Sequence, residues 1–172
     1  MKNIRIDDTA FTITPSASSS PTDFDFLMGN HTVHHRKLKD RLTGSNDWLE
    51  FDGTHTMEPL LQGIGNLEQH RMTAADGNPV EGIALRLFDP QTRLWSIYWA
   101  DSRSGKLGIP MIGSFDEGIG YFLAKEEFNG IPILVQFKWD ASNPDLPVWS
   151  QAYSVDNGNA WEWNWVMNFV RA

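Results

Sequence analysis

The sequence predicts an all-β protein, a closed antiparallel meander β-barrel of about ten strands with a short N-terminal helix. From residue 31 onward, the chain divides into short segments in which apolar and polar residues alternate with a period of two. Turns rich in Gly, Asn, Asp and Pro separate these segments, so successive strands run antiparallel. An open β-sandwich is the structural alternative, but closing a long meander into a barrel removes its unpaired edges.

The 172 residues are enough for one domain. Residues 1–22 end in a Ser-rich run and are expected to form a disordered tail before a barrel domain over residues 23–172. Thr22–Gly29 has a polar cap, apolar residues three and four apart and a terminal Gly, which predicts one or two helical turns. The candidate strands then follow at 31–38, 47–52, 54–60, 65–72, 80–88, 94–101, 109–115, 119–127, 131–140, 148–156 and 159–171.

Turn chemistry predicts the register of the terminal hairpin. A type I′ turn on Asn157-Gly158 places Gln151 opposite Asn164 and Tyr153 opposite Glu162, on the same strand face as Trp149. The opposite face then carries Trp161, Trp163 and Trp165. The other turns predict facing pairs in the same way: Leu123 with Gln136 across Asn129-Gly130, Glu50 with His55 across Asp52-Gly53, and both Arg86 with Ser96 and Ala84 with Tyr98 across Asp89–Arg93.

Composition excludes several functional classes. With 14 basic and 22 acidic residues the formal net charge is −8, and because no basic run interrupts it, nucleic acid and anionic membranes are not expected partners. The absence of cysteine excludes disulfides, thiolate metal sites and a cysteine nucleophile. No apolar stretch approaches the ~20 residues of a membrane span, and Met1–Ser20 lacks the pattern of a secretory signal, so a cytoplasmic location is expected.

A short helix ending in Gly, a first strand opening at Gly29-Asn30-His31 and a strict antiparallel meander together resemble the calycin superfamily, which comprises lipocalins, fatty-acid-binding proteins and nitrobindins. Four motifs narrow the resemblance. They are Asp25–Gly29, Leu85–Pro90, Trp95–Trp99 and Trp161–Trp165, and they resemble most narrowly a bacterial group of lipocalin-like barrels of unknown function. One departure is His31, which occupies the position of the Trp in the lipocalin Gly-x-Trp signature. Nitrobindins bind haem through one histidine, but no residue here matches that ligand, so no cofactor is expected.

The cluster His31-x-x-His34-His35 does not predict a metal site. On a strand, His31 and His35 share a face about 13 Å apart at roughly 3.3 Å per residue, and His34 points to the opposite face. The sequence therefore predicts no metal ligands and places these histidines at the surface or the barrel rim.

A mixed strand face gives the candidate binding site. If this face lines the lumen, its polar groups converge on a mostly apolar cavity, as in a small-ligand site; if it faces water, they are ordinary solvated side chains. The candidate ligand-binding residues are Trp149, Gln151, Tyr153, Asn164, Arg86 and Gln136. We therefore expect the protein to bind a small, largely apolar ligand with a polar head group. The Trp residues of the other face are expected to pack in the core, and the alternatives are that they stack on an aromatic ligand or face outward onto a partner subunit.

Two further expectations concern chemistry and assembly. The alternative to a binding protein is a metal-independent acid–base lyase, isomerase or hydrolase using the same cavity, with Glu162, Tyr98, Glu50 and His55 as candidate catalytic residues. Binding is preferred because no arrangement of nucleophile, base and oxyanion donors can be identified, and a purely structural role is the third alternative. The many Trp and Phe residues make both faces of some strands apolar, which predicts a homodimer.

Overall fold

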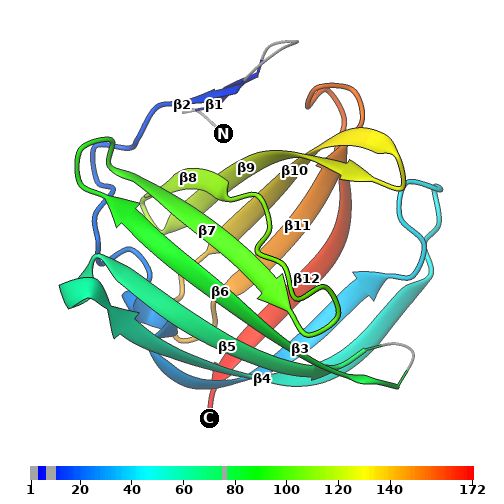
Figure 1. Ribbon diagram of the computed structural model, residues 1–172, viewed down its shortest axis with the longest axis horizontal. Coiled ribbons are helices and arrows are strands. Elements are labelled where there is room, and N and C mark those ends of the chain that lie inside the picture. The colour runs from blue at the N-terminus through cyan, green and yellow to red at the C-terminus, as the bar shows by residue number, and fades with distance from the viewer. Residues whose placement is uncertain (1–3, 7–10, 75–76) are drawn as a thin grey trace.

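The computed structural model describes residues 4–6, 11–74 and 77–172. Ten antiparallel strands, each paired with the next along the chain, close into a barrel because the last strand pairs with the first (Figure 1). The strands are β3 (Gly29–Leu38), β4 (Trp48–Leu60), β5 (Gly65–Thr73), β6 (Pro79–Asp89), β7 (Leu94–Asp101), β8 (Met111–Asp116), β9 (Ile119–Phe128), β10 (Ile131–Asp140), β11 (Val148–Ser154) and β12 (Glu162–Arg171). The predicted closed all-β barrel is confirmed.

The predicted N-terminal helix is not formed. Asp25–Leu27 make a single 3-10 turn, η1, and β3 begins two residues later at Gly29. The segment is held by its side chains instead, since Phe24 and Leu27 are fully buried in the barrel. The few residues before β3 are too short a segment to form the several hydrogen-bonded turns that a stable helix requires.

The described part of the N-terminal segment contacts the barrel. Strands β1 (Ile4–Ile6) and β2 (Phe11–Ile13) pair with each other. Further along, the Ser16 hydroxyl donates to Asp116 Oδ1 at 2.7 Å, and Trp95 Nε1 donates to the Ser20 carbonyl at 3.2 Å. Residues 1–3 and 7–10 of the expected disordered tail lie outside the described residues.

The predicted hairpin at Asp52-Gly53 is wrong. The two candidate strands 47–52 and 54–60 form one continuous strand, β4, and Gly53 has no positive φ. Glu50 and His55 therefore lie on one strand with opposite orientations: Glu50 is exposed and His55 is 1% exposed inside the barrel. A short 3-10 turn, η2 (Leu61–Gly63), makes the actual connection from β4 to β5.

The Asn-Gly turns are placed as predicted. Asn129 and Gly130 both have positive φ, and Leu123 pairs with Gln136. In the terminal hairpin Tyr153 pairs with Glu162, but a β-bulge between Gln151 and Ala152 shifts the rest of the register by one residue. Gln151 consequently pairs with Trp165 rather than Asn164, and Trp149 with Met167. The bulge turns Trp165 into the barrel, away from the face predicted for it.

The register predicted across β6 and β7 is also wrong by one residue. Asp89 pairs with Leu94, so Ala84 faces Trp99 rather than Tyr98, and Arg86 faces Ile97 rather than Ser96. A one-residue slip exchanges the two faces of a strand. Trp95, Ile97 and Trp99 therefore point inward, and Tyr98 points outward.

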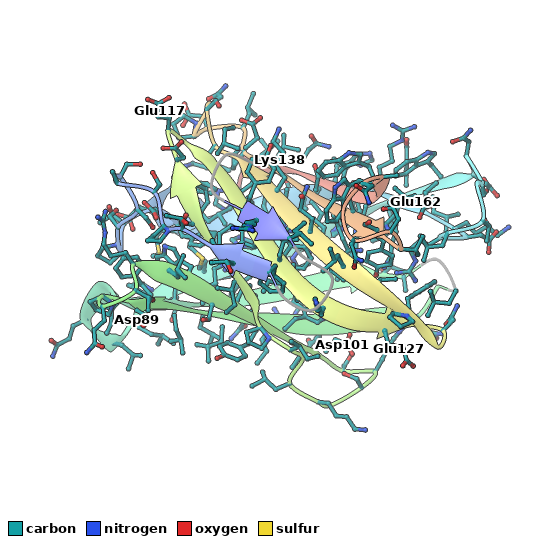
Figure 2. All side chains as sticks on the ribbon, turned by 90° about the horizontal axis from the view of Figure 1, so that it is seen from above. Asp89, Asp101, Glu117, Glu127, Lys138 and Glu162 are labelled. Carbon is teal, nitrogen blue, oxygen red and sulfur yellow. The ribbon has the colours of Figure 1, made fainter. Side chains whose placement is uncertain are left out.

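The two ends of the barrel differ. Phe24 fills the floor, with ring centroids 4.9 Å from Trp95 and 5.0 Å from Phe115. The opposite end, which we call the mouth, is formed by the β3–β4 loop, the β7–β8 loop and the β9–β10 turn, on the right in Figure 1. Figure 2 shows side chains that mark the two ends: Asp89 and Glu117 lie at the floor end, and Asp101, Glu127 and Glu162 at the mouth end.

Candidate functional site

The barrel encloses a cavity of about 220 Å³ between the floor and the mouth. Most of its wall is aromatic or apolar, including Trp99, Phe137, Trp139, Trp149, Trp165 and Met111. Its polar residues are Glu68, His70 and Arg86 on the neighbouring strands β5 and β6, which form the polar wall, together with Gln151 on β11 and Glu126 on β9. These side chains meet because strand alternation directs every second residue of each strand into the lumen.

Glu68 on β5 is the centre of the buried polar wall. Its side chain is 4% exposed and forms an ion pair with Arg86 Nη2 from β6. His70 Nδ1 lies 3.3 Å from Glu68 Oε1, and His55 Nε2 lies 3.4 Å from Oε2. The second guanidinium arm, Arg86 Nη1, donates to Asn66 Oδ1 at 3.2 Å. The buried Glu68 carboxylate thus contacts side chains from the three strands β4, β5 and β6.

The geometry gives this network a direction. Trp165 Nε1 can only donate, and it lies 3.2 Å from His35 Nδ1, so that ring nitrogen accepts. His35 then carries its proton on Nε2 and donates it to His70 Nε2 at 3.0 Å. His70 in turn carries its proton on Nδ1, facing Glu68. The chain of donors therefore runs from the cavity's Trp165 to the Glu68 carboxylate through two neutral imidazoles.

A second pair of histidines extends the network on the floor side. His31 Nδ1 and His55 Nδ1 lie 3.2 Å apart, with each side chain 1% exposed. The prediction that His31 and His35 lie at the surface or rim is therefore wrong, whereas His34, on the opposite face of β3, is exposed as expected. Among the described residues, no group of three or more His, Asp or Glu side chains is arranged to hold a metal ion.

Burial and the ion pair set the charge states of this wall. Burial on its own would raise the pKa of Glu68, but the Arg86 charge and the adjacent histidines outweigh it and hold the pKa well below its usual value. Burial is the main cause that lowers the pKa of His35 to about 3. Burial and the charge of His55 lower the pKa of His31 to about 4. At neutral pH, Glu68 is ionised and both of these histidines are neutral.

Gly53 makes room for the histidine contact. A Cβ added at Gly53 would lie 2.7 Å from the Arg71 carbonyl, 3.0 Å from His35 Nε2 and 3.3 Å from His70 Nε2. Because a backbone atom is the nearest obstacle, we expect Gly53→Ala to destabilise the protein by about 1–3 kcal/mol in chemical unfolding. The exposed neighbour serves as control: Thr54→Ala should change stability by no more than about 0.5 kcal/mol. Equal effects of the two changes would contradict this role of Gly53.

The structure places three of the predicted ligand-binding residues on the cavity wall: Arg86, Trp149 and Gln151. Asn164 is fully buried behind them and accepts a hydrogen bond from Gln151 Nε2 at 2.9 Å. Tyr153 is buried towards the mouth, where Arg41 Nη1 donates to its hydroxyl at 3.2 Å. Gln136 is buried on the outer side of β10, since its neighbours Val135 and Phe137 line the lumen.

The four candidate catalytic residues are not brought together. Glu162 accepts hydrogen bonds from the Leu42 backbone N–H at 2.9 Å and so anchors the β3–β4 loop. Tyr98 points outward, and Glu50 lies outside the barrel 3.8 Å from Arg36. His55 alone reaches the interior network. Arg86, which the sequence suggested as a ligand-binding residue, is paired with Glu68.

Sequence reasoning missed the centre of the site, Glu68, together with its partner His70. The available signal was the polar series Asn66, Glu68 and His70 at every second position of one strand. That pattern is also what a solvated strand face shows, so alternation alone does not distinguish a buried polar wall from a wet surface.

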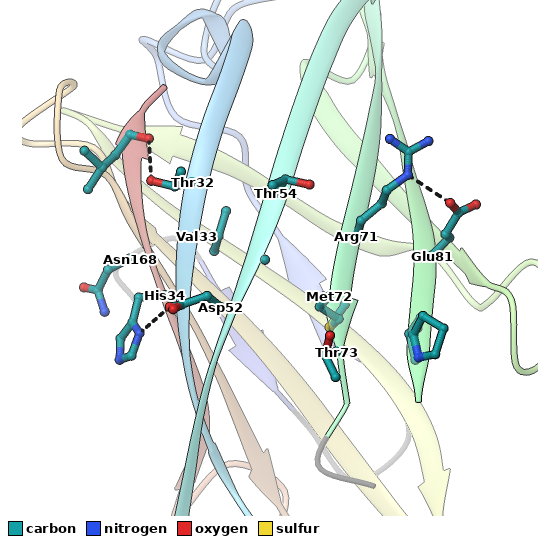
Figure 3. Close-up of a pocket in the computed structure, with 14 residues that line it drawn as sticks. Thr32, Val33, His34, Asp52, Thr54, Arg71, Met72, Thr73, Glu81 and Asn168 are labelled. Atoms are coloured by element: carbon teal, nitrogen blue, oxygen red, sulfur yellow. Dashed lines mark hydrogen bonds and ion pairs between the residues drawn. The ribbon is translucent and has the colours of Figure 1, made fainter. Parts of the chain in front are cut away.

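A larger hollow of about 680 Å³ lies on the outside of the barrel, over β12 and β3–β6. Figure 3 shows its charged groups already paired: His34 Nδ1 with Asp52 Oδ1 and Arg71 Nε with Glu81 Oε1, both at 2.9 Å. All four side chains are about half exposed or more, so water competes for their contacts. The interior cavity, with its buried groups, is therefore the stronger candidate site.

The comparisons with known proteins show the fold. No protein-family model and no curated protein matches the sequence. The crystal structure of Rv2717c from M. tuberculosis aligns with a TM-score of 0.55 and 12% identity, over 87% of this chain and 97% of that chain. The S-type phycobiliprotein lyase CPES from Guillardia theta aligns with a TM-score of 0.62 and 8% identity, over 91% and 94% of the two chains. The chain thus shares a lipocalin-like barrel with both.

The described part of the chain contains no helix of the length and apolar character that crossing a membrane requires.

Proposed function

We propose that the protein binds a compact, largely apolar aromatic molecule in the barrel cavity, with the polar group of the ligand against the polar wall at Arg86. The observation that carries this proposal is an enclosed lumen whose walls are mostly indole, phenyl and thioether groups, with a cluster of polar groups on the neighbouring strands β5 and β6. Sites for small ligands have this composition. The resemblance to a phycobiliprotein lyase agrees with a ligand-binding barrel.

The size of the cavity limits the ligand. At about 220 Å³ it is smaller than the roughly 300–1,000 Å³ of pockets for drug-sized molecules. We therefore expect a molecule of one ring or two small fused rings. The surrounding Trp99, Trp149 and Trp165 offer flat faces to such a ring system.

The enzymatic alternative has less support. A general base works best when its pKa lies near the operating pH. The pKa of Glu68 is held well below its usual value, because the Arg86 charge and the adjacent histidines outweigh the opposing effect of burial. Glu68 is therefore a weak base, and its carboxylate oxygens are occupied by protein groups.

A cavity-filling substitution tests the proposal. Ala84 lines the cavity and is 3% exposed, so Ala84→Leu should occupy ligand space and lower affinity at least about tenfold. Calorimetry would use four probes with one bicyclic skeleton: indane, 1-indanone, 1-aminoindane and indane-1-carboxylate.

The control is Ala100→Leu, which makes the same change on the outer face of β7 and should leave affinity unchanged. The proposal is wrong if none of the four probes binds the wild-type protein saturably, or if both Leu variants bind as the wild type does.

A further inference from the structure

Two hydrogen-bond donors in the cavity wall lack an acceptor. Among the buried side-chain atoms of the described residues, Arg86 Nε and Trp139 Nε1 have no hydrogen-bond partner. Both residues line the cavity, and Arg86 and Trp139 are 3% and 2% exposed. The Arg86 guanidinium carbon lies 5.8 Å from the centre of the Trp139 ring, so the two side chains that carry these donors are neighbours in the wall.

Neither side chain is free to turn its donor elsewhere. The other nitrogens of Arg86 are held by Glu68 and Asn66, and its guanidinium lies over the Phe24 ring at 4.8 Å. The Trp139 ring contacts the rings of Phe24 at 6.0 Å and Phe169 at 5.3 Å. An unpaired buried N–H loses the hydrogen bond that it would make with water, so two fixed donors beside a cavity favour an occupant that supplies an acceptor.

The charge of the same wall selects the kind of acceptor. The Arg86 charge is already balanced by Glu68, and the donor chain from Trp165 makes His70 neutral. A ligand carboxylate would bring a second anion beside Glu68, and Glu126 adds another carboxyl group to the cavity lining. A neutral oxygen satisfies both donors without this repulsion.

We propose that the ligand carries a neutral carbonyl oxygen, which accepts hydrogen bonds from Arg86 Nε and Trp139 Nε1 at the floor of the cavity. This inference rests on the proposed function and makes it specific: the ligand class is a small aromatic ketone, aldehyde, amide or quinone. The aromatic part then lies towards the mouth, between Trp99, Trp149 and Trp165.

The four probes test the inference on the wild-type protein. We expect 1-indanone to bind about five- to tenfold more tightly than indane, as one or two net hydrogen bonds predict, and more tightly than 1-aminoindane or indane-1-carboxylate. The infrared C=O stretch of bound 1-indanone should shift to lower frequency than in an apolar solvent. Equal affinity for indane and 1-indanone, or tightest binding of the carboxylate, overturns the inference while leaving the binding function intact.

A matched pair of variants locates the oxygen. Trp139→Phe removes one donor and keeps a ring in place, so the preference for 1-indanone over indane should fall to about twofold or less. Trp149→Phe makes the same change on the cavity wall at an indole nitrogen that is not among the unpartnered atoms, and should preserve the preference.

A preference that survives Trp139→Phe places the oxygen elsewhere and overturns the assignment. If Trp139→Phe does not fold, the affinities and the C=O stretch of the wild-type complex decide the inference. If no probe binds the wild-type protein, the proposed function and this inference fail together.

Discussion

Replacing Glu68 with Gln is expected to lower the free energy of unfolding by about 3–5 kcal/mol, because the substitution leaves the Arg86 guanidinium charged, buried and without its counter-ion. The same change also removes the carboxylate that faces His70 and His55. Urea or guanidinium unfolding at neutral pH measures the effect.

Two control variants distinguish the effect of leaving a buried charge unpaired from the effect of losing any ion pair. Glu81→Gln breaks an exposed pair, Glu81 with Arg71 at 2.9 Å, and should cost no more than about 1 kcal/mol. The double variant Glu68→Leu with Arg86→Met removes both buried charges and should recover much of the stability lost in Glu68→Gln. A Glu68→Gln effect no larger than that of Glu81→Gln would contradict the central position of this ion pair.

Acidification from pH 7.5 to pH 5 is expected to cost about 4 kcal/mol of stability. Burial is the main reason that the pKa is lowered from 6.5 in the unfolded chain to about 4 for His31 and about 3 for His35. A lowered folded-state pKa means that the unfolded chain binds more protons, so the contribution of each histidine is complete above pH 6.5 and is lost as the pH falls. Each contributes about 2 kcal/mol over this interval.

Glu68 acts in the same direction at lower pH. Its pKa is also held below the usual value, because the Arg86 charge and the histidines outweigh burial, and its contribution is lost as the carboxylate takes up a proton. Unfolding free energies measured at several pH values should therefore fall continuously on the acid side of pH 6.5.

A pair of histidine variants assigns the pH dependence. His35→Gln removes one buried titrating ring and should reduce the loss between pH 7.5 and pH 5 to about 2 kcal/mol, whatever its effect at neutral pH. His34→Gln changes an exposed neighbour on the opposite face of β3 and should leave the slope unchanged. A stability that is flat between pH 5 and pH 7.5 in the wild type would show that these rings are not buried in their neutral form.

The buried ion pair and its histidines also form part of the cavity. The Glu68–Arg86 pair and its histidines stabilise one side of the lumen, while the aromatic side chains surround the remaining space. The protein's own groups already satisfy most of this polar wall, and few of its donors are left without a partner.

The sequence by itself determined the closed barrel and most of its strands. Strand alternation and turn preferences are local properties, so they can be recognised without knowing which strands meet. The hairpin at Asn129-Gly130 was predicted with its register, because both residues tolerate the positive φ that a type I′ turn requires. The dipeptide Asp52-Gly53 also resembles a turn. Gly53 instead lies inside β4, where the lack of a side chain leaves room for the rings of His35 and His70.

Only the tertiary structure decided which faces of β7 and β12 line the lumen. The pairing of one additional residue, Asp89, and one bulge at Gln151 each reverse a strand's faces, and neither has a clear signature in the sequence. The polar wall likewise depends on closure, because Glu68 meets Arg86, His55 and the chain from Trp165 only when residues distant in sequence lie on neighbouring strands of one barrel. Burial then removes the competing water, which is what fixes the charges and hydrogen-bond directions of these groups.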